Sequence, residues 1–78
     1  MNIKIIQVVL KNKLLYKGAL DGLAGPLTRA AVKAGLIQFS PTGRWTAWPP
    51  KRQRIAFMQY HFASLGIDTG VVDGYIGP

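Results

Sequence analysis

The chain has 78 residues, which is enough for one small domain with a modest hydrophobic core and little room for a buried active site. Hydrophobic residues make up 49% of it, which favours a folded chain, and the absence of cysteine excludes a disulfide framework and a thiolate metal site. Ten Lys and Arg against three acidic residues give a formal net charge of +7, which favours anionic partners such as nucleic acid, anionic lipid headgroups or acidic cell-wall polymers.

The first predicted element is a helix that begins near the N-terminus. Ile3, Ile6, Leu10 and Leu14 recur at helical spacing, although the β-branched run in this segment is also compatible with a strand. The segment is too short and too polar for a signal peptide or a membrane span, so we expect no membrane insertion. If the protein works outside the cytoplasm, something else has to carry it there.

A second, shorter helix is predicted from Pro26 to Ala34. Proline is favoured at the first position of a helix, and Gly35 is predicted to end this one. The following residues, 36–50, contain Ser-Pro, Thr-Gly and two tryptophans, and are predicted to form a long ordered loop.

The third predicted helix begins at Pro49-Pro50 and ends at Gly66, which is expected to adopt a left-handed conformation. Its apolar face is formed by Ile55, Met58, Phe62 and Leu65. This segment aligns with the first helix and has few β-branched residues, so both are predicted to be helical. The fold class is therefore all-α, a small bundle of about three helices.

The most informative pattern is Asp-Gly-x-x-Gly-Pro, which occurs twice at an offset of 52 residues (73 minus 21). Its fixed positions are Asp21, Gly22, Gly25 and Pro26 in the first copy, and Asp73, Gly74, Gly77 and Pro78 in the second. The same offset also pairs Ile3 with Ile55, Gln7 with Gln59 and Gly18 with Gly70. We interpret this as an internal duplication of a helix followed by a structured turn.

The duplication divides a single module over 1–78 into a first copy at 1–35, a loop at 36–50 and a second copy at 51–78. The second copy stops at Pro78, where its following helix would begin, so we expect the chain to be a truncated piece of a longer protein. Within each turn the Asp side chain can accept backbone N–H groups, and Gly supplies positive φ. Asp21 and Asp73 are therefore predicted to be structural.

These motifs resemble the peptidoglycan-binding domain family, the small helical modules attached to many bacterial and phage cell-wall hydrolases. In that family a helix carrying a Gln precedes a Gly-x-x-Asp-Gly-x-x-Gly-Pro-x-Thr-x-x-Ala-Val segment. The matching residues are Gln7, Gly18, Asp21, Gly22, Gly25, Pro26, Thr28, Ala31 and Val32, and in the second copy Gln59, Gly70, Asp73, Gly74, Gly77 and Pro78. Residues 36–50 depart from the family pattern. The resemblance implies a helical bundle that binds the glycan or stem peptide of murein and targets an attached hydrolase, such as a phage endolysin or a bacterial autolysin, to the cell wall at the periplasmic or extracellular face.

No catalytic constellation is visible in the sequence. Glycosidases usually need two carboxylates held about 5 to 10 Å apart, and the only acids are Asp21, Asp68 and Asp73. The single histidine, His61, is predicted to lie within a helix, and no cluster offers the three ligands of a catalytic zinc site. We therefore predict a noncatalytic chain that holds no metal and no cofactor.

Binding is predicted at the aromatic and basic residues, because sugar rings stack on aromatic side chains and cations attract acidic groups. The predicted contact residues are Trp45, Trp48, Arg44, Arg52 and Arg54, with Tyr16 and Tyr75 beside the turns. The alternative for the tryptophans is that they lock the loop onto the helices as part of the core.

Two rival functions fit part of the sequence. The segment from Thr28 to Leu36, followed by Thr42 to Trp45, loosely resembles a helix-turn-helix, and the positive charge suits phosphate binding. DNA binding explains neither the second motif nor the proline-rich loop, so no nucleic-acid partner is expected. The basic apolar segment from Lys4 to Lys17 raises the other rival, a membrane-active helix, but its apolar positions nearly encircle the helix, which suits a core better.

Overall fold

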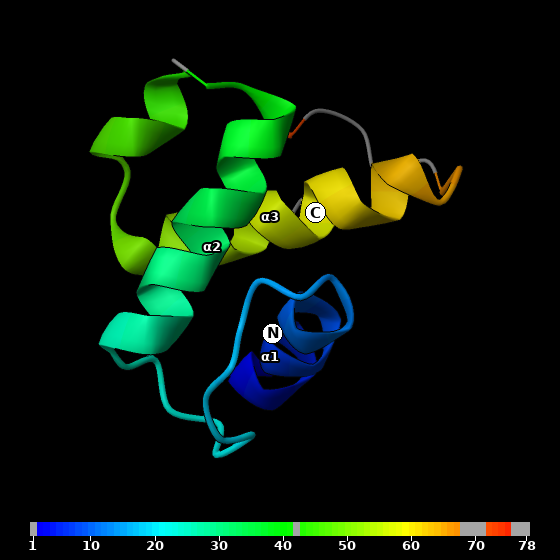
Figure 1. Ribbon diagram of the computed structural model, residues 1–78. Helices are drawn as coiled ribbons and strands as arrows, with labels where there is room; N and C mark the ends of the chain where they lie inside the picture. The colour runs from blue at the N-terminus through cyan, green and yellow to red at the C-terminus, as the bar shows by residue number, and fades with distance from the viewer. Residues whose placement is uncertain (1, 42, 68–71, 76–78) are drawn as a thin grey trace.

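The computed structural model describes residues 2–41, 43–67 and 72–75. These residues form three α-helices, α1 (Ile3–Asn12), α2 (Pro26–Phe39) and α3 (Pro50–Ser64), with a short 3-10 helix, η1 (Arg44–Ala47), before α3 and no strand among them. In Figure 1, α2 crosses in front of α3, and α1 lies below them. The prediction of a small all-α bundle is confirmed.

The helix starts follow from local chemistry. Asn2 caps α1, because its side-chain oxygen accepts the backbone N–H of Lys4 at 2.8 Å. Pro26 and Pro50 occupy the first positions of α2 and α3, where the missing N–H of proline is harmless. Beyond the end of α3, Gly66 has φ +82° and donates its N–H to the Ala63 carbonyl at 3.0 Å, which confirms its predicted left-handed conformation.

The core lies where the three helices meet. Its most deeply buried apolar side chains, all at most 2% exposed, are Ile6, Leu10, Val32, Leu36, Ala56, Phe57 and Met58. The contact between α2 and α3 is the most extensive one between elements, and α1 packs on α2 over a smaller area. Each helix therefore contributes one apolar face to a single core.

The prediction that Gly35 ends the second helix is wrong, because α2 continues to Phe39. Gly35 is buried in the middle of α2, and a Cβ atom at this position would collide with the ring of Phe57. The glycine is required because α2 approaches α3 closely at this point. This constraint comes from tertiary packing, so the neighbouring sequence does not reveal it.

Two apolar positions predicted for helix faces lie outside the helices. Helix α1 ends at Asn12, and Leu14 is 85% exposed with φ 61°. The neighbouring Leu15 packs against the core in its place, and its N–H donates to the Leu10 carbonyl at 2.9 Å. Leu65 follows the end of α3 and is 62% exposed. In both cases the helix ends before the position at which its periodicity would bring the leucine against the core.

The predicted loop at 36–50 is only partly correct. Its first residues form the last turn of α2, which ends at Phe39, and η1 occupies residues 44–47. The Trp45 indole N–H donates to the Ser40 carbonyl at 2.6 Å and so ties η1 to the end of α2.

Candidate functional site

The first Asp-Gly turn is organised by Gln7, a completely buried side chain of α1. The Gly22 N–H donates to Gln7 Oε1 at 3.0 Å. Four acceptors lie within hydrogen-bonding distance of Gln7 Nε2: Thr28 Oγ1 at 3.0 Å, Asp21 Oδ1 and the Leu23 carbonyl at 3.1 Å each, and the Tyr16 hydroxyl at 3.4 Å. A single buried amide therefore holds the segment between α1 and α2 on the core.

Asp21 completes this turn from its exposed side. Its carboxylate accepts the Leu23 N–H at 2.9 Å, and Gly22 has φ +73°. The Leu23 N–H, followed by the Gln7 amide, lowers the pKa of Asp21, since both bonds favour the charged carboxylate. These contacts support the structural role predicted for Asp21.

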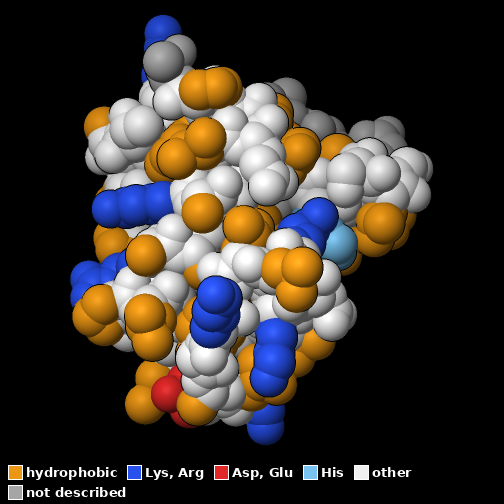
Figure 2. All heavy atoms as spheres, in the orientation of Figure 1, with side chains coloured by type: hydrophobic (Ala, Val, Ile, Leu, Met, Phe, Trp, Pro, Cys, Tyr) orange, Lys and Arg blue, Asp and Glu red, His pale blue; other side chains and the backbone are white. Residues whose placement is uncertain are grey.

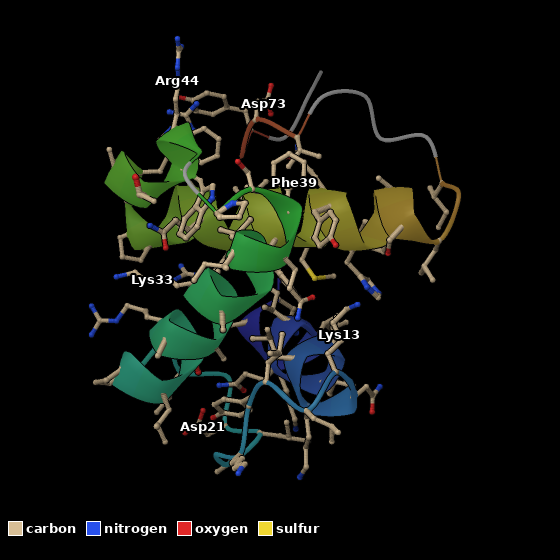
Figure 3. The ribbon with its side chains drawn as sticks, turned by 45° about the horizontal axis from the view of Figure 1, so that its top comes forward. Lys13, Asp21, Lys33, Phe39, Arg44 and Asp73 are labelled. Atoms are coloured by element: carbon tan, nitrogen blue, oxygen red, sulfur yellow. The ribbon has the colours of Figure 1, made fainter. Side chains whose placement is uncertain are left out.

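The second Asp-Gly turn repeats most of these hydrogen bonds. Gln59 Oε1 accepts the N–H groups of Asp73 at 3.1 Å and Gly74 at 2.8 Å, while Gln59 Nε2 donates to Asp73 Oδ1 at 3.3 Å. Asp73 also accepts the Tyr75 N–H at 2.9 Å, which is the largest cause of its lowered pKa. The two turns lie at opposite ends of the molecule, as the labels of Asp21 and Asp73 show in Figure 3.

The likeness of the turns agrees with their aligned sequences, but an internal duplication stays a prediction. The first turn leads directly into α2 at Pro26. Gly77 and Pro78 of the second copy, and also Asp68, lie outside the described residues.

The second turn carries a feature that the first lacks, a stack of three side chains. The Arg52 guanidinium carbon lies 3.9 Å from the ring centroid of Trp48 and 4.1 Å from that of Tyr75. Arg52 Nε also donates to the Asp73 carbonyl at 2.9 Å, which fixes the guanidinium between the rings. Trp48 is half-buried and Tyr75 is 58% exposed, so part of the stack faces solvent.

A shallow hollow of about 500 Å³ adjoins this stack. It is lined by Pro49, Lys51, Arg52, Ile55, Gly74 and Tyr75. The walls are mainly apolar and aromatic, with two cations at the edge. Such a surface can receive the flat C–H face of a sugar ring and an acidic group at the same time.

The structure brings together three of the predicted contact residues, Trp48, Arg52 and Tyr75. Trp45 and Tyr16 are different, since each is only 5% exposed and belongs to the core. The alternative that a tryptophan locks the loop onto the helices therefore holds for Trp45. Tyr16 donates its hydroxyl hydrogen to the Ala19 carbonyl at 2.5 Å and supports the first turn.

The other two predicted cations, Arg44 and Arg54, are not part of the stack. Arg44 is exposed on η1. Arg54 is half-buried, and burial followed by repulsion from Arg29 lowers its pKa. Neither guanidinium shares an aromatic contact of the kind that holds Arg52.

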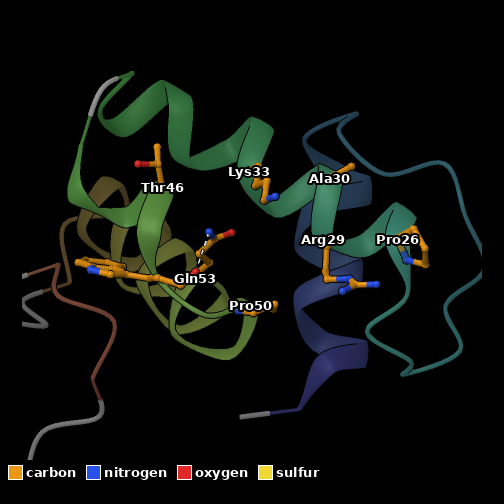
Figure 4. Close-up of a pocket in the computed structure, with 8 residues that line it drawn as sticks. Pro26, Arg29, Ala30, Lys33, Thr46, Pro50 and Gln53 are labelled. Atoms are coloured by element: carbon orange, nitrogen blue, oxygen red, sulfur yellow. Dashed lines mark hydrogen bonds between the residues drawn. The ribbon is translucent and has the colours of Figure 1, made fainter.

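A second hollow, of about 380 Å³, lies between α2 and the segment formed by η1 and the start of α3 (Figure 4). Arg29, Ala30 and Lys33 line it from α2, and Thr46, Trp48 and Gln53 line it from the other side. Trp48 thus lines this hollow, while Arg52, stacked on the same ring, lines the first one. The stacked pair of Trp48 and Arg52 therefore links the linings of the two hollows.

The sequence interpretation did not single out Gln53, whose side chain is only 4% exposed. Its Nε2 donates to the carbonyls of Trp45 and Trp48 at 3.1 Å each, and so fixes the end of η1. Arg29 and Lys33 were missed as well, because an exposed cation on a helix has no distinctive local pattern.

The positive charge is spread over the surface. Figure 2 shows Lys and Arg side chains separated by hydrophobic ones over the visible face, with acidic atoms at one place near the lower edge. In the part of the chain that the structure describes, no Lys or Arg forms an ion pair with a carboxylate, no group of three His, Cys, Asp or Glu side chains gathers, and no helix could cross a bilayer.

His61 lies within α3, as predicted, and its Nδ1 atom is buried without a hydrogen-bond partner. Burial, followed by the positive charge of Lys13, lowers the pKa of His61. The ring packs beside Phe62 at a centroid distance of 5.8 Å.

No protein-family model, curated protein or solved structure matches this chain.

Proposed function

We propose that this chain is a noncatalytic module that binds bacterial peptidoglycan and directs an attached cell-wall hydrolase to murein. The single observation that carries the proposal is the stack of Trp48, Arg52 and Tyr75 beside an apolar hollow of about 500 Å³. The doubled Asp-Gly-x-x-Gly-Pro motif and the small helical bundle give it further support.

The stack suits a glycan that carries acidic groups. An aromatic ring offers a sugar a flat apolar surface at little entropic cost, since few of its own torsions become fixed on binding. Arg52 is held in place by two rings and a carbonyl, so it is preorganised for an anionic group near the sugar. Murein combines both chemistries, because its sugars bear acidic peptides.

The two described aspartates are committed to the turns, which supports binding without catalysis. Asp21 and Asp73 accept backbone N–H groups two residues ahead and the amide of a glutamine. A carboxylate that is charged and engaged in this way is poorly suited to act as a general acid.

DNA binding by a helix-turn-helix receives no support from the fold. Helix α2 runs without interruption through Gly35, where the motif would need its turn. The segment that would supply the recognition helix contains only η1, a single 3-10 turn over residues 44–47.

Cosedimentation with purified sacculi, with duplex DNA and anionic vesicles as competitors, tests the proposal. We expect the chain to sediment with sacculi at low and high salt, without releasing soluble sugars or peptides. Stacking persists at high salt, whereas binding to DNA phosphates falls by orders of magnitude over the same range.

Complete loss of sacculus binding at moderate salt, together with tight DNA or vesicle binding, would contradict the proposal. Release of soluble murein fragments by the chain alone would overturn its noncatalytic assignment.

A further inference from the structure

Three glutamines tie loops to the helices, and they differ in the use of their carbonyl oxygens. Gln7 Oε1 accepts the Gly22 N–H, and Gln59 Oε1 accepts the N–H groups of Asp73 and Gly74. Gln53 also holds a loop, because its Nε2 donates to the carbonyls of Trp45 and Trp48. No described residue donates to its Oε1, however. The Gln53 side chain is almost fully buried, yet this Oε1 atom stays open to solvent.

This acceptor belongs to the 380 Å³ hollow between α2 and η1. In Figure 4 the Gln53 amide lies between η1 and α2, with Lys33 and Arg29 on the opposite wall. Thr46 adds a hydroxyl that already donates to the Gly43 carbonyl at 3.2 Å and can still accept. The volume falls within the range of about 300 to 1,000 Å³ typical of small-ligand sites.

The charge around this hollow is uncompensated. No acidic side chain is among its lining residues. Arg29 also repels the half-buried Arg54, which contributes to the lowered pKa of Arg54. A bound anion would relieve this repulsion, so the hollow favours a ligand with negative charge at the α2 wall and a hydrogen-bond donor at the Gln53 wall.

We propose that this hollow binds the carboxyl end of a peptide, with the terminal carboxylate at Arg29 and Lys33 and the last amide N–H donated to Gln53 Oε1. The inference rests on the proposed function and deepens it, since it assigns the stem peptide of murein to this hollow and the sugar to the neighbouring one across Trp48. A peptide end supplies both groups within one residue, whereas an internal peptide segment lacks the terminal carboxylate.

Titration of the intact chain with short peptides, followed by backbone amide NMR shifts, tests this assignment. The probes are N-acetyl-D-alanyl-D-alanine, for the murein source, and N-acetyl-L-alanyl-L-alanine, for an ordinary protein C-terminus. Each is compared with its C-terminal carboxamide. We expect the free acids to shift the amides of Thr46 and Gln53 and to bind at least fivefold more tightly than the carboxamides, with the D-isomer preferred.

The variant Lys33→Gln removes one cation from the hollow, and Lys11→Gln removes one from an exposed position on α1 as a matched control. Lys33→Gln should weaken peptide binding about fivefold, while Lys11→Gln should leave it within twofold. Equal effects of the two variants, or equal affinity for acid and carboxamide, would overturn the inference.

Sacculus binding, measured on the same samples, separates this inference from the proposed function. If sacculi bind while the free acids do not, the peptide assignment is wrong and the proposed function stands. If the L-peptide acid binds as well as the D-isomer in a Lys33-dependent way and sacculi do not bind, the hollow takes protein C-termini and the proposed function is wrong.

Discussion

The two Asp-Gly turns share most of their hydrogen bonds but differ in what surrounds them. In the first turn Gln7 is completely buried and also reaches Tyr16 and Thr28. In the second turn Gln59 is half-buried, and the turn is held from outside by Arg52 between Trp48 and Tyr75. The first turn is therefore part of the core, whereas the second lies at the candidate binding surface.

This difference shows how one local motif can serve two purposes. The Asp and Gly residues fix the path of the chain in both places, because a carboxylate that accepts the N–H two residues ahead and a glycine with positive φ require little else. The residue after the glycine is free to vary. It is Leu23 in the first turn and Tyr75 in the second, and both are more than half exposed.

The largest effect is expected from replacing the two glutamines. Gln7→Ala leaves several buried groups without partners, and each unpaired group costs about 1 to 3 kcal/mol, so the free energy of unfolding should fall by roughly 3 kcal/mol or more. Gln59→Ala should lower it less, since water can reach a half-buried turn. Urea unfolding measures both variants, and equal destabilisation would break the distinction between a core turn and a surface turn.

The glycines at the centre of the turns should reverse this order. Gly22 and Gly74 have φ +73° and +78°, which costs about 1 to 2 kcal/mol for alanine. A Cβ at position 22 would lie 3.9 Å from the nearest atom, Lys4 Cβ, whereas at position 74 it would collide with Arg52. Overpacking adds about 1 to 3 kcal/mol, so Gly74→Ala should be the more destabilising variant in thermal melts. A larger effect of Gly22→Ala would contradict the stacked geometry.

A smaller, pH-dependent effect is expected from α3. Burial and Lys13 hold the pKa of His61 below its ordinary value of 6.5, so the folded state binds this proton more weakly than the unfolded state. Above pH 6.5 His61 is neutral in both states and does not change the free energy of unfolding. As the pH falls from 6.5 through the lowered pKa, the unfolded state binds the proton first, so the free energy of unfolding decreases. The melting temperature should drop between pH 7.5 and 5.5 in the parent chain and less in His61→Gln. The aspartates act separately at lower pH, since their pKa values lie below 3.8.

Much of the backbone could be predicted from the sequence because the signals were local. Pro26 and Pro50 begin helices, Gly66 follows the last one, and the Asp-Gly turns have the expected positive φ. Gly35 could not be interpreted correctly, because a helix-ending glycine and a glycine at a helix crossing look alike in one sequence. Only the ring of Phe57 on α3 distinguishes them.

The candidate site could be predicted only in part for a similar reason. Trp45 and Trp48 are three residues apart in the same segment, yet one is in the core and the other lies against Arg52. Gln53 gave no signal, because its importance comes from carbonyls that only the folded chain brings to it. Aromatic and basic composition identified the region, and tertiary packing decided which members face solvent.

We propose that the second turn, and not the first, carries the binding surface for peptidoglycan. Sacculus cosedimentation of Tyr75→Ala beside its aligned counterpart Leu23→Ala tests this most directly, since both side chains are exposed and neither variant should unfold the chain. Loss of ring stacking, about 0.5 to 1.5 kcal/mol, should weaken binding by Tyr75→Ala up to about tenfold. Leu23→Ala should bind like the parent chain. Equal binding by the two variants, or a greater loss in Leu23→Ala, would contradict the account.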